Sequence, residues 1–269
     1  MPSSRAPVFA MLLLVVGVPS TQGCGDAATP PTCASVAGAR TATTDAISAT
    51  LARIKEADRL GAILFSYERD GAPILRTALG ESTPGVPATT GMHFRIGGVG
   101  WQYMTTMLLR LVERKQVALT DPVSRWYPDY PYADRAGVRM LGASSAGFAD
   151  YIDSQPFLDE VAADPLRVWT ADDLITRSLP PYKKGPVFAP GQDWAYSHTE
   201  FVMLGAILEK VAGKGYSALL QELVLDPLGL RDTRIQLDAD PQQPVLHTLA
   251  DETVEDSTYW NPSFVSWGA

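Results

Sequence analysis

Basic residues, histidine and cysteine are all scarce in this chain of 269 residues. Lysine and arginine number 22 against 30 aspartate and glutamate, which leaves a formal net charge of −8. Without a basic field the chain cannot gain affinity from a phosphate backbone, which argues against nucleic acid as a partner. Three histidines and two cysteines, with no His-Glu-x-x-His motif, are too few for a metal site. We therefore expect no metal and no cofactor.

A short apolar run stands near the amino terminus. It extends from Ala6 to Val18, follows Arg5, and is too short to span a bilayer. Small residues follow it as far as Gly23. This order is typical of a secretory signal peptide over residues 1–23, and the alternative is a buried core helix. We expect an exported protein, periplasmic or extracellular.

Cys24 follows the predicted signal peptide directly. It resembles the acylated cysteine of bacterial lipoproteins, although Thr21 stands where that pattern normally has leucine. Lipidation would give a membrane tether through Cys24, whereas a disulfide with Cys33 is the competing hypothesis in an exported protein. Residues 24–43, rich in Ala, Thr, Pro and Gly, are interpreted as a flexible tether.

The remaining sequence predicts a mixed α and β domain with two lobes. Apolar spacing indicates a first helix from Thr44 and another over residues 100–115. Asp70-Gly71 between two β-rich runs predicts a hairpin over residues 62–79. Two further features indicate helix ends: a Thr170 to Asp173 capping-box spacing, and Gly213 after an apolar helical pattern.

Several segments together resemble one family. They are Phe94-Arg-Ile-Gly97, Leu109–Glu113, Leu119–Ser124, Pro190-Gly191, Tyr196-Ser197 and Leu204–Gly213. In this order they resemble the serine β-lactamase and penicillin-binding-protein superfamily, in the branch of class C β-lactamases, D-alanyl-D-alanine carboxypeptidases and family VIII esterases. The resemblance implies a β-lactamase/transpeptidase-like α+β fold, with an antiparallel sheet flanked by helices and an all-helical lobe.

The family's chemistry needs a Ser-x-x-Lys motif, whose spacing places nucleophile and lysine on one helix face. On this chain the motif places Gly98 at the serine and Trp101 at the lysine. Glycine has nothing to acylate, and an indole N–H is a donor without a base. For Trp101 we favour a core position on the helix over a role in stacking against substrate.

The family's second motif, Tyr-x-Asn, is half retained. Tyr196 keeps the tyrosine and His198 replaces the asparagine. Tyr196 could hydrogen-bond in a cleft or pack among aromatic neighbours; His198 could bind a ligand, or serve as a helix cap or surface residue. The segment Ser144–Tyr151 occupies the place of a family loop that lines the cleft.

The third motif, Lys or His-x-Gly, is not present before Ala269. In relatives it lies on late strands that pair with the early hairpin and are followed by a carboxyl-terminal helix. We therefore expect residues 44–269 to form a partial β-lactamase-related domain that lacks these strands and this helix. The hairpin would then have an unpaired edge and an uncovered apolar face.

Four hypotheses follow, of which a catalytically inactive relative is favoured. A second keeps hydrolysis through Ser144 or Ser197, with His198 or His247 as base and Asp193 as its orienter. A third, metal-dependent hydrolysis prompted by His198-Thr-Glu200, has too few ligands. The fourth is a module that binds a small-molecule or peptide-like ligand, including muropeptide fragments, without turnover. The sequence carries no signal for an oligomeric state.

Overall fold

The computed structural model describes residues 33–236, 241, 243–247, 249–250 and 255–266. They form two compact units, which are described separately. The first unit takes the chain up to Phe94 and the segment Gln242–Asp256; the second takes Arg95–Pro241 and the residues from Ser257 onward. None of the helices in the described ranges is long and apolar enough to cross a membrane.

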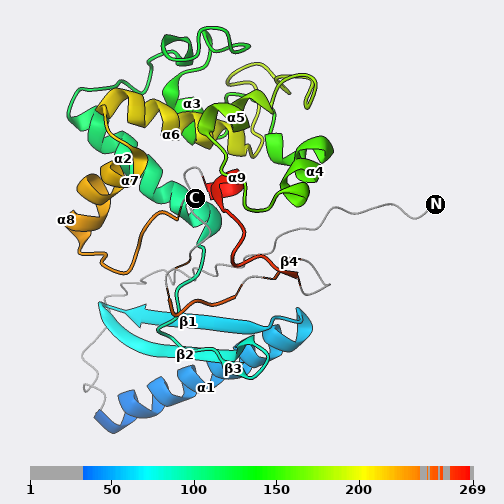
Figure 1. The fold of residues 1–269 in the computed structure, drawn as a ribbon. Helices are drawn as coiled ribbons and strands as arrows, with labels where there is room; N and C mark the ends of the chain where they lie inside the picture. Colours follow the sequence, from blue (N-terminus) through cyan, green and yellow to red (C-terminus); the bar gives the residue numbers. More distant parts are fainter. Residues whose placement is uncertain (1–32, 237–240, 242, 248, 251–254, 267–269) are drawn as a thin grey trace. The chain divides into compact units, whose positions relative to one another are not determined.

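The first unit is a small antiparallel sheet with one long helix (Figure 1). Helix α1 (Cys33–Ala57) packs on strands β1 (Ala62–Arg69) and β2 (Ala72–Thr83), and the short β3 (Val86–Pro87) pairs with β2. Strands β4 (Leu249–Ala250) and β5 (Glu255–Asp256) pair in a separate ribbon.

The predicted hairpin is confirmed. Strand β1 pairs with β2 from Ala62 opposite Gly80 to Arg69 opposite Ala72. Asp70 and Gly71, with φ of 52° and 73°, make the turn between them, as residues that tolerate positive φ do in a tight hairpin. In the described part of the chain β1 has one strand partner, so its outer edge is unpaired as expected, while α1 packs against both strands.

The start of α1 differs from the prediction. We expected a flexible tether over residues 24–43 and a helix from Thr44, but the helix begins at Cys33. The helix extends into this stretch because it contains several alanines, and alanine has the highest helix propensity. Residues 1–32 lie outside the described residues. The predicted signal peptide and Cys24 fall in this range. The two alternative predictions for Cys24, lipidation and a disulfide with Cys33, therefore stay predictions.

The second unit is a bundle around helix α6 (His198–Ala212). Ten consecutive residues of α6, from Thr199 to Leu208, are buried, as expected for a helix surrounded on all sides. Around it pack α2 (Gly100–Glu113), α3 (Val138–Gly142), α5 (Ala171–Thr176) and α7 (Tyr216–Leu220) (Figure 1). The remaining helices are α4 (Gln155–Ala163), α8 (Asp226–Leu228) and α9 (Ser263–Ser266). Short helical turns η1 to η4 cover Gly97–Val99, Val123–Arg125, Tyr151–Asp153 and Gln221–Leu225.

Three helix predictions in this unit are confirmed. Helix α2 covers the predicted apolar stripe, and its inward side chains include the fully buried Met104 and Leu111. Helix α6 ends at Gly213, whose φ of 64° is the left-handed C-terminal conformation that glycine adopts without cost. The capping box before α5 is present in both directions between Thr170 and Asp173.

Candidate functional site

Gly98 lies in η1, two residues before helix α2 begins at Gly100. A Cβ atom placed on Gly98 would lie 3.4 Å from the hydroxyl of Tyr196 and 3.8 Å from the ring of Trp101. These are ordinary or slightly tight contacts, so the structure has room for a small side chain at this position. Packing around Gly98 therefore does not by itself require glycine at this position.

Trp101, the residue predicted at the family's lysine position, lies among aromatic rings. Its ring stacks on Phe201 with centroids 3.7 Å apart and planes 9° from parallel, and it lies 4.8 Å from the ring of Tyr196. Its indole Nε1 is buried and has no hydrogen-bond partner among the described residues. These contacts agree with the packing role that the sequence favoured, and they place no basic group beside Gly98.

Tyr196 directs its hydroxyl toward Gly98, while 47% of the residue remains exposed. Partial burial and the nearby Asp150 carboxylate both raise the pKa of Tyr196 above its ordinary value. The hydroxyl is therefore protonated at neutral pH, where it can donate a hydrogen bond but does not act as a phenolate base.

His198 begins helix α6 and is paired with Asp150. Nδ1 of His198 lies 2.8 Å from Oδ2 of Asp150, and both side chains are mostly buried. The imidazole is surrounded by the aromatic rings of Tyr196, Trp101 and Tyr151, at centroid distances of 5.0, 5.6 and 6.2 Å. Because an ionised carboxylate only accepts hydrogen bonds, Nδ1 donates its N–H to Asp150. In the neutral imidazole, Nε2 is then the nitrogen that can accept a hydrogen bond.

The predicted orienter, Asp193, is wrong for His198. Its Oδ1 accepts the backbone N–H of Trp194 at 2.8 Å. Asp150, 48 residues before His198 in the chain, takes that role instead. The other proposed base, His247, belongs to the first unit and pairs with Asp256 at 2.7 Å.

Neither candidate serine is hydrogen-bonded to His198. Ser197 is buried, and its Oγ has no partner among the described residues. Ser144 is also buried, and its recorded contacts are made by its backbone: its N–H donates to Leu141 at 3.3 Å and its carbonyl accepts from Ala195 at 3.1 Å. The described structure therefore contains no nucleophile-to-base hydrogen bond between these serines and this imidazole.

The segment His198-Thr-Glu200 contacts the loop over residues 144–151. The described residues contain no cluster of three or more metal-ligating side chains. Glu200 is fully buried, and its two carboxylate oxygens accept the backbone N–H groups of Ala146 and Phe148 at 3.2 and 3.0 Å. Burial is the largest effect on its pKa and raises it to about 7. The only local signal for this contact is a carboxylate within an apolar helical pattern.

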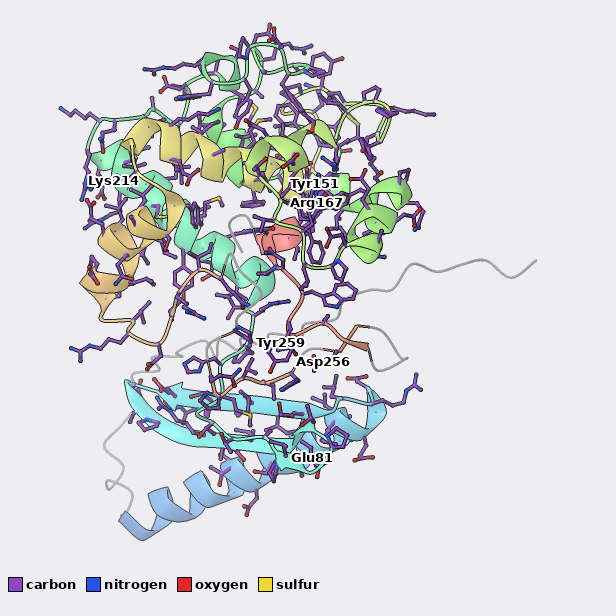
Figure 2. All side chains as sticks on the ribbon, in the orientation of Figure 1. Glu81, Tyr151, Arg167, Lys214, Asp256 and Tyr259 are labelled. Carbon is purple, nitrogen blue, oxygen red and sulfur yellow. The ribbon has the colours of Figure 1, made fainter. Side chains whose placement is uncertain are left out.

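Arg95 fixes the chain just before Gly98. Its guanidinium donates to the backbone carbonyls of Thr258 and Trp260, each at 2.8 Å, and to that of Ser257 at 3.3 Å. The segment it holds carries Tyr259 (Figure 2). The four positions predicted from the family motifs, Gly98, Trp101, Tyr196 and His198, are thus brought together at the adjoining ends of α2 and α6.

The family model described as Beta-lactamase matches residues 47–265 of the chain. The protein belongs to the beta-lactamase family. Its β-lactamase-like α+β fold, with helices and a small antiparallel sheet, agrees with the fold expected from the sequence.

Curated relatives of this family member include an esterase and a peptidase. Esterase EstB of Burkholderia gladioli is 29% identical over 71% of this chain and 50% of its own length. The D-alanyl-D-alanine-carboxypeptidase/endopeptidase AmpH of Escherichia coli K12 is 28% identical over 61% of this chain and 43% of its own. The chain thus spans half or less of these relatives. Among solved structures, D-amino acid amidase from Ochrobactrum anthropi SV3 has a TM-score of 0.66 at 25% identity, covering 80% of this chain and 62% of that one.

Proposed function

We propose that this protein is a non-catalytic member of the beta-lactamase family that binds a small-molecule or peptide-like ligand beside Gly98 and Tyr196. The observation that carries the proposal is the pair of Gly98 and Trp101 at the family's serine and lysine positions. An acyl-enzyme requires an oxygen nucleophile and a group that accepts its proton. Gly98 supplies no oxygen, and Trp101 supplies no base.

The neighbouring groups do not replace this pair. Tyr196 lies opposite Gly98 but keeps its proton at neutral pH, because burial and Asp150 raise its pKa. Asp150 orients the imidazole of His198 as in a catalytic triad, but the adjacent Ser197 makes no hydrogen bond to that imidazole in the described part of the chain. These contacts disfavour the alternative of hydrolysis by a non-standard serine nucleophile.

Exposed aromatic side chains favour binding at this place. Trp194 and Tyr196 are 64% and 47% exposed, on the segment that leads into α6 beside Gly98. Large exposed aromatic residues commonly anchor ligands through apolar contact with one polar handle. Related structures are named as D-amino acid amidase complexed with D-phenylalanine. By analogy, we propose a ligand that contains a D-amino acid or its amide, including muropeptide fragments. We also propose that the protein is exported and that Cys24 tethers it to a membrane.

Covalent labelling tests the loss of catalysis. Purified protein, incubated with a fluorescent penicillin and separately with a p-nitrophenyl ester, should show neither labelling nor turnover above buffer. As a matched control, the double variant Gly98→Ser and Trp101→Lys restores nucleophile and base, and should gain labelling. Labelling of the unmodified protein that disappears in Ser144→Ala or Ser197→Ala would overturn the proposal.

Thermal shift tests the binding function. D-phenylalanine amide and a muropeptide fragment, added in excess, should raise the melting temperature of the unmodified protein, because a ligand of the folded state stabilises it. The variant Trp194→Ala should remove the shift. Tyr132→Ala, which truncates an aromatic residue that is 42% exposed on another loop, should keep it. Equal ligand-induced increases in melting temperature in both variants would contradict binding beside Trp194 and Tyr196.

A further inference from the structure

The first turn of helix α6 contacts the loop over residues 144–151 through three consecutive side chains. His198 pairs with Asp150 at 2.8 Å. Thr199 donates its hydroxyl to the carbonyl of Ala149 at 2.7 Å and accepts the N–H of Tyr151 at 3.2 Å. Glu200 accepts from the N–H groups of residues 146 and 148. Each residue of the turn therefore contacts a different part of the loop over residues 144–151.

The carboxylate of Glu200 accepts hydrogen bonds from this loop and not from its own helix. Ser197 is the N-cap of α6, so Glu200 is the third helical residue, where a capping-box glutamate would reach back to the N-cap N–H. Here its two oxygens accept from Ala146 and Phe148 instead. A buried carboxylate is costly without such donors, so its presence requires the loop to stay in this conformation.

We propose that Glu200 is the positioning residue of the Asp150–His198 pair: its carboxylate accepts the loop N–H groups and thereby holds Asp150 against the imidazole of His198. The loop residues 144–150 belong to no helix or strand, so these bonds take the place of a backbone ladder. The connection is short, because Asp150 follows Phe148 by two residues. Loss of the Glu200 bonds frees the backbone that presents Asp150.

Other acidic and phenolic groups face this carboxylate. Asp150 interacts with Glu200 electrostatically, as does the hydroxyl of Tyr130, which is hydrogen-bonded to Ser178 at 2.7 Å. Like charges on Glu200 and Asp150 repel, and the backbone donors of the loop offset that repulsion. The pKa of Glu200, raised to about 7 by burial, means that both charge states occur near neutral pH. The positioning of His198 should therefore respond to pH through Glu200.

Nitrogen-15 NMR of the histidine rings tests this proposal. The chain has three histidines, and His198→Gln identifies the signal of interest. In the unmodified protein we expect His198 to populate mainly the Nδ1–H tautomer, held by Asp150. Glu200→Gln should reduce this population and raise the amide exchange rates of Ala146 and Phe148 at least about tenfold, since each loses a charged acceptor. Asp150→Asn should change the ring signal in the same direction.

Glu209→Gln is the matched control. Glu209 lies on the same helix, and its carboxylate also accepts a backbone N–H, from Tyr216 at 2.6 Å. This variant should increase exchange at Tyr216 and leave the His198 ring unchanged. If Glu200→Gln frees the loop amides without altering the His198 tautomer, the proposal is wrong.

If Glu200→Gln does not fold, two further measurements still test the proposal. Glu200→Asp keeps a carboxylate one methylene shorter and should shift the tautomer in the same direction. In the unmodified protein, the chemical shift of the Phe148 amide should change with pH with a midpoint near 7, set by the Glu200 carboxyl, and the absence of such a step would overturn the proposal. The role of Glu200 is proposed for residues beside the proposed ligand site, but these measurements do not require a ligand. Turnover of a penicillin would refute the proposed function and leave this inference standing.

Discussion

At the scale of single residues, one buried carboxyl dominates the expected pH response of the fold. Burial raises the pKa of Glu200 to about 7 from an ordinary value of 4.5. Between these values the folded protein retains a proton that the unfolded chain has released, so the free energy of unfolding falls as pH rises. We predict a decrease of up to about 3 kcal/mol between pH 4.5 and 7 from this residue alone. Urea unfolding of the wild type and Glu200→Gln measures it.

The difference between the two curves isolates this residue. Glu160 and Asp173 have lowered pKa values, through hydrogen bonds to Tyr182 and Thr170 and through neighbouring arginines, and they act in the opposite sense. Their stabilisation is lost as pH falls below the ordinary carboxyl range, equally in both proteins. Above that range Glu200→Gln should lose less stability than the wild type. Parallel curves between pH 5 and 8 would show that Glu200 does not titrate as described.

At the scale of elements, local patterns predicted those structures whose cause is local. The hairpin turn at Asp70 and Gly71, the end of α6 at Gly213 and the capping box at Thr170 each depend on a few adjacent residues. The start of α1 was not predictable from composition, because the alanines that occur in flexible segments also favour helix.

The candidate site was predictable only in part for the same physical reason. Motif spacing indicated Gly98, Trp101, Tyr196 and His198, and the structure brings these four together. The partner of His198 was not predictable, because Asp150 lies 48 residues away and the contact depends on how the loop packs on α6. Asp193 is nearer in sequence, but its carboxylate accepts the backbone N–H of Trp194.

At the scale of the whole molecule, the two units differ in how much core they contain. The hydrophobic cluster of buried side chains, from Met104 to Leu225, belongs entirely to the second unit. In the first unit, Leu51 and Val245 are the buried hydrophobic residues of the described part. Ser82 adds one polar link there, because its hydroxyl donates to the carbonyl of Val245 at 3.2 Å and accepts the N–H of His247 at 2.9 Å.

A small sheet with few buried side chains should open before a bundle with a continuous core. We predict that native-state amide exchange will be at least about tenfold faster in the β1 and β2 strands than in the buried turns of α6. Leu204→Ala, which empties part of the bundle core, should lower protection in α6 by about 2–5 kcal/mol. Because Leu204 belongs to the second unit's core, protection in the hairpin should stay unchanged. Equal protection in both units, lost together in Leu204→Ala, would show instead that the chain unfolds as one cooperative unit.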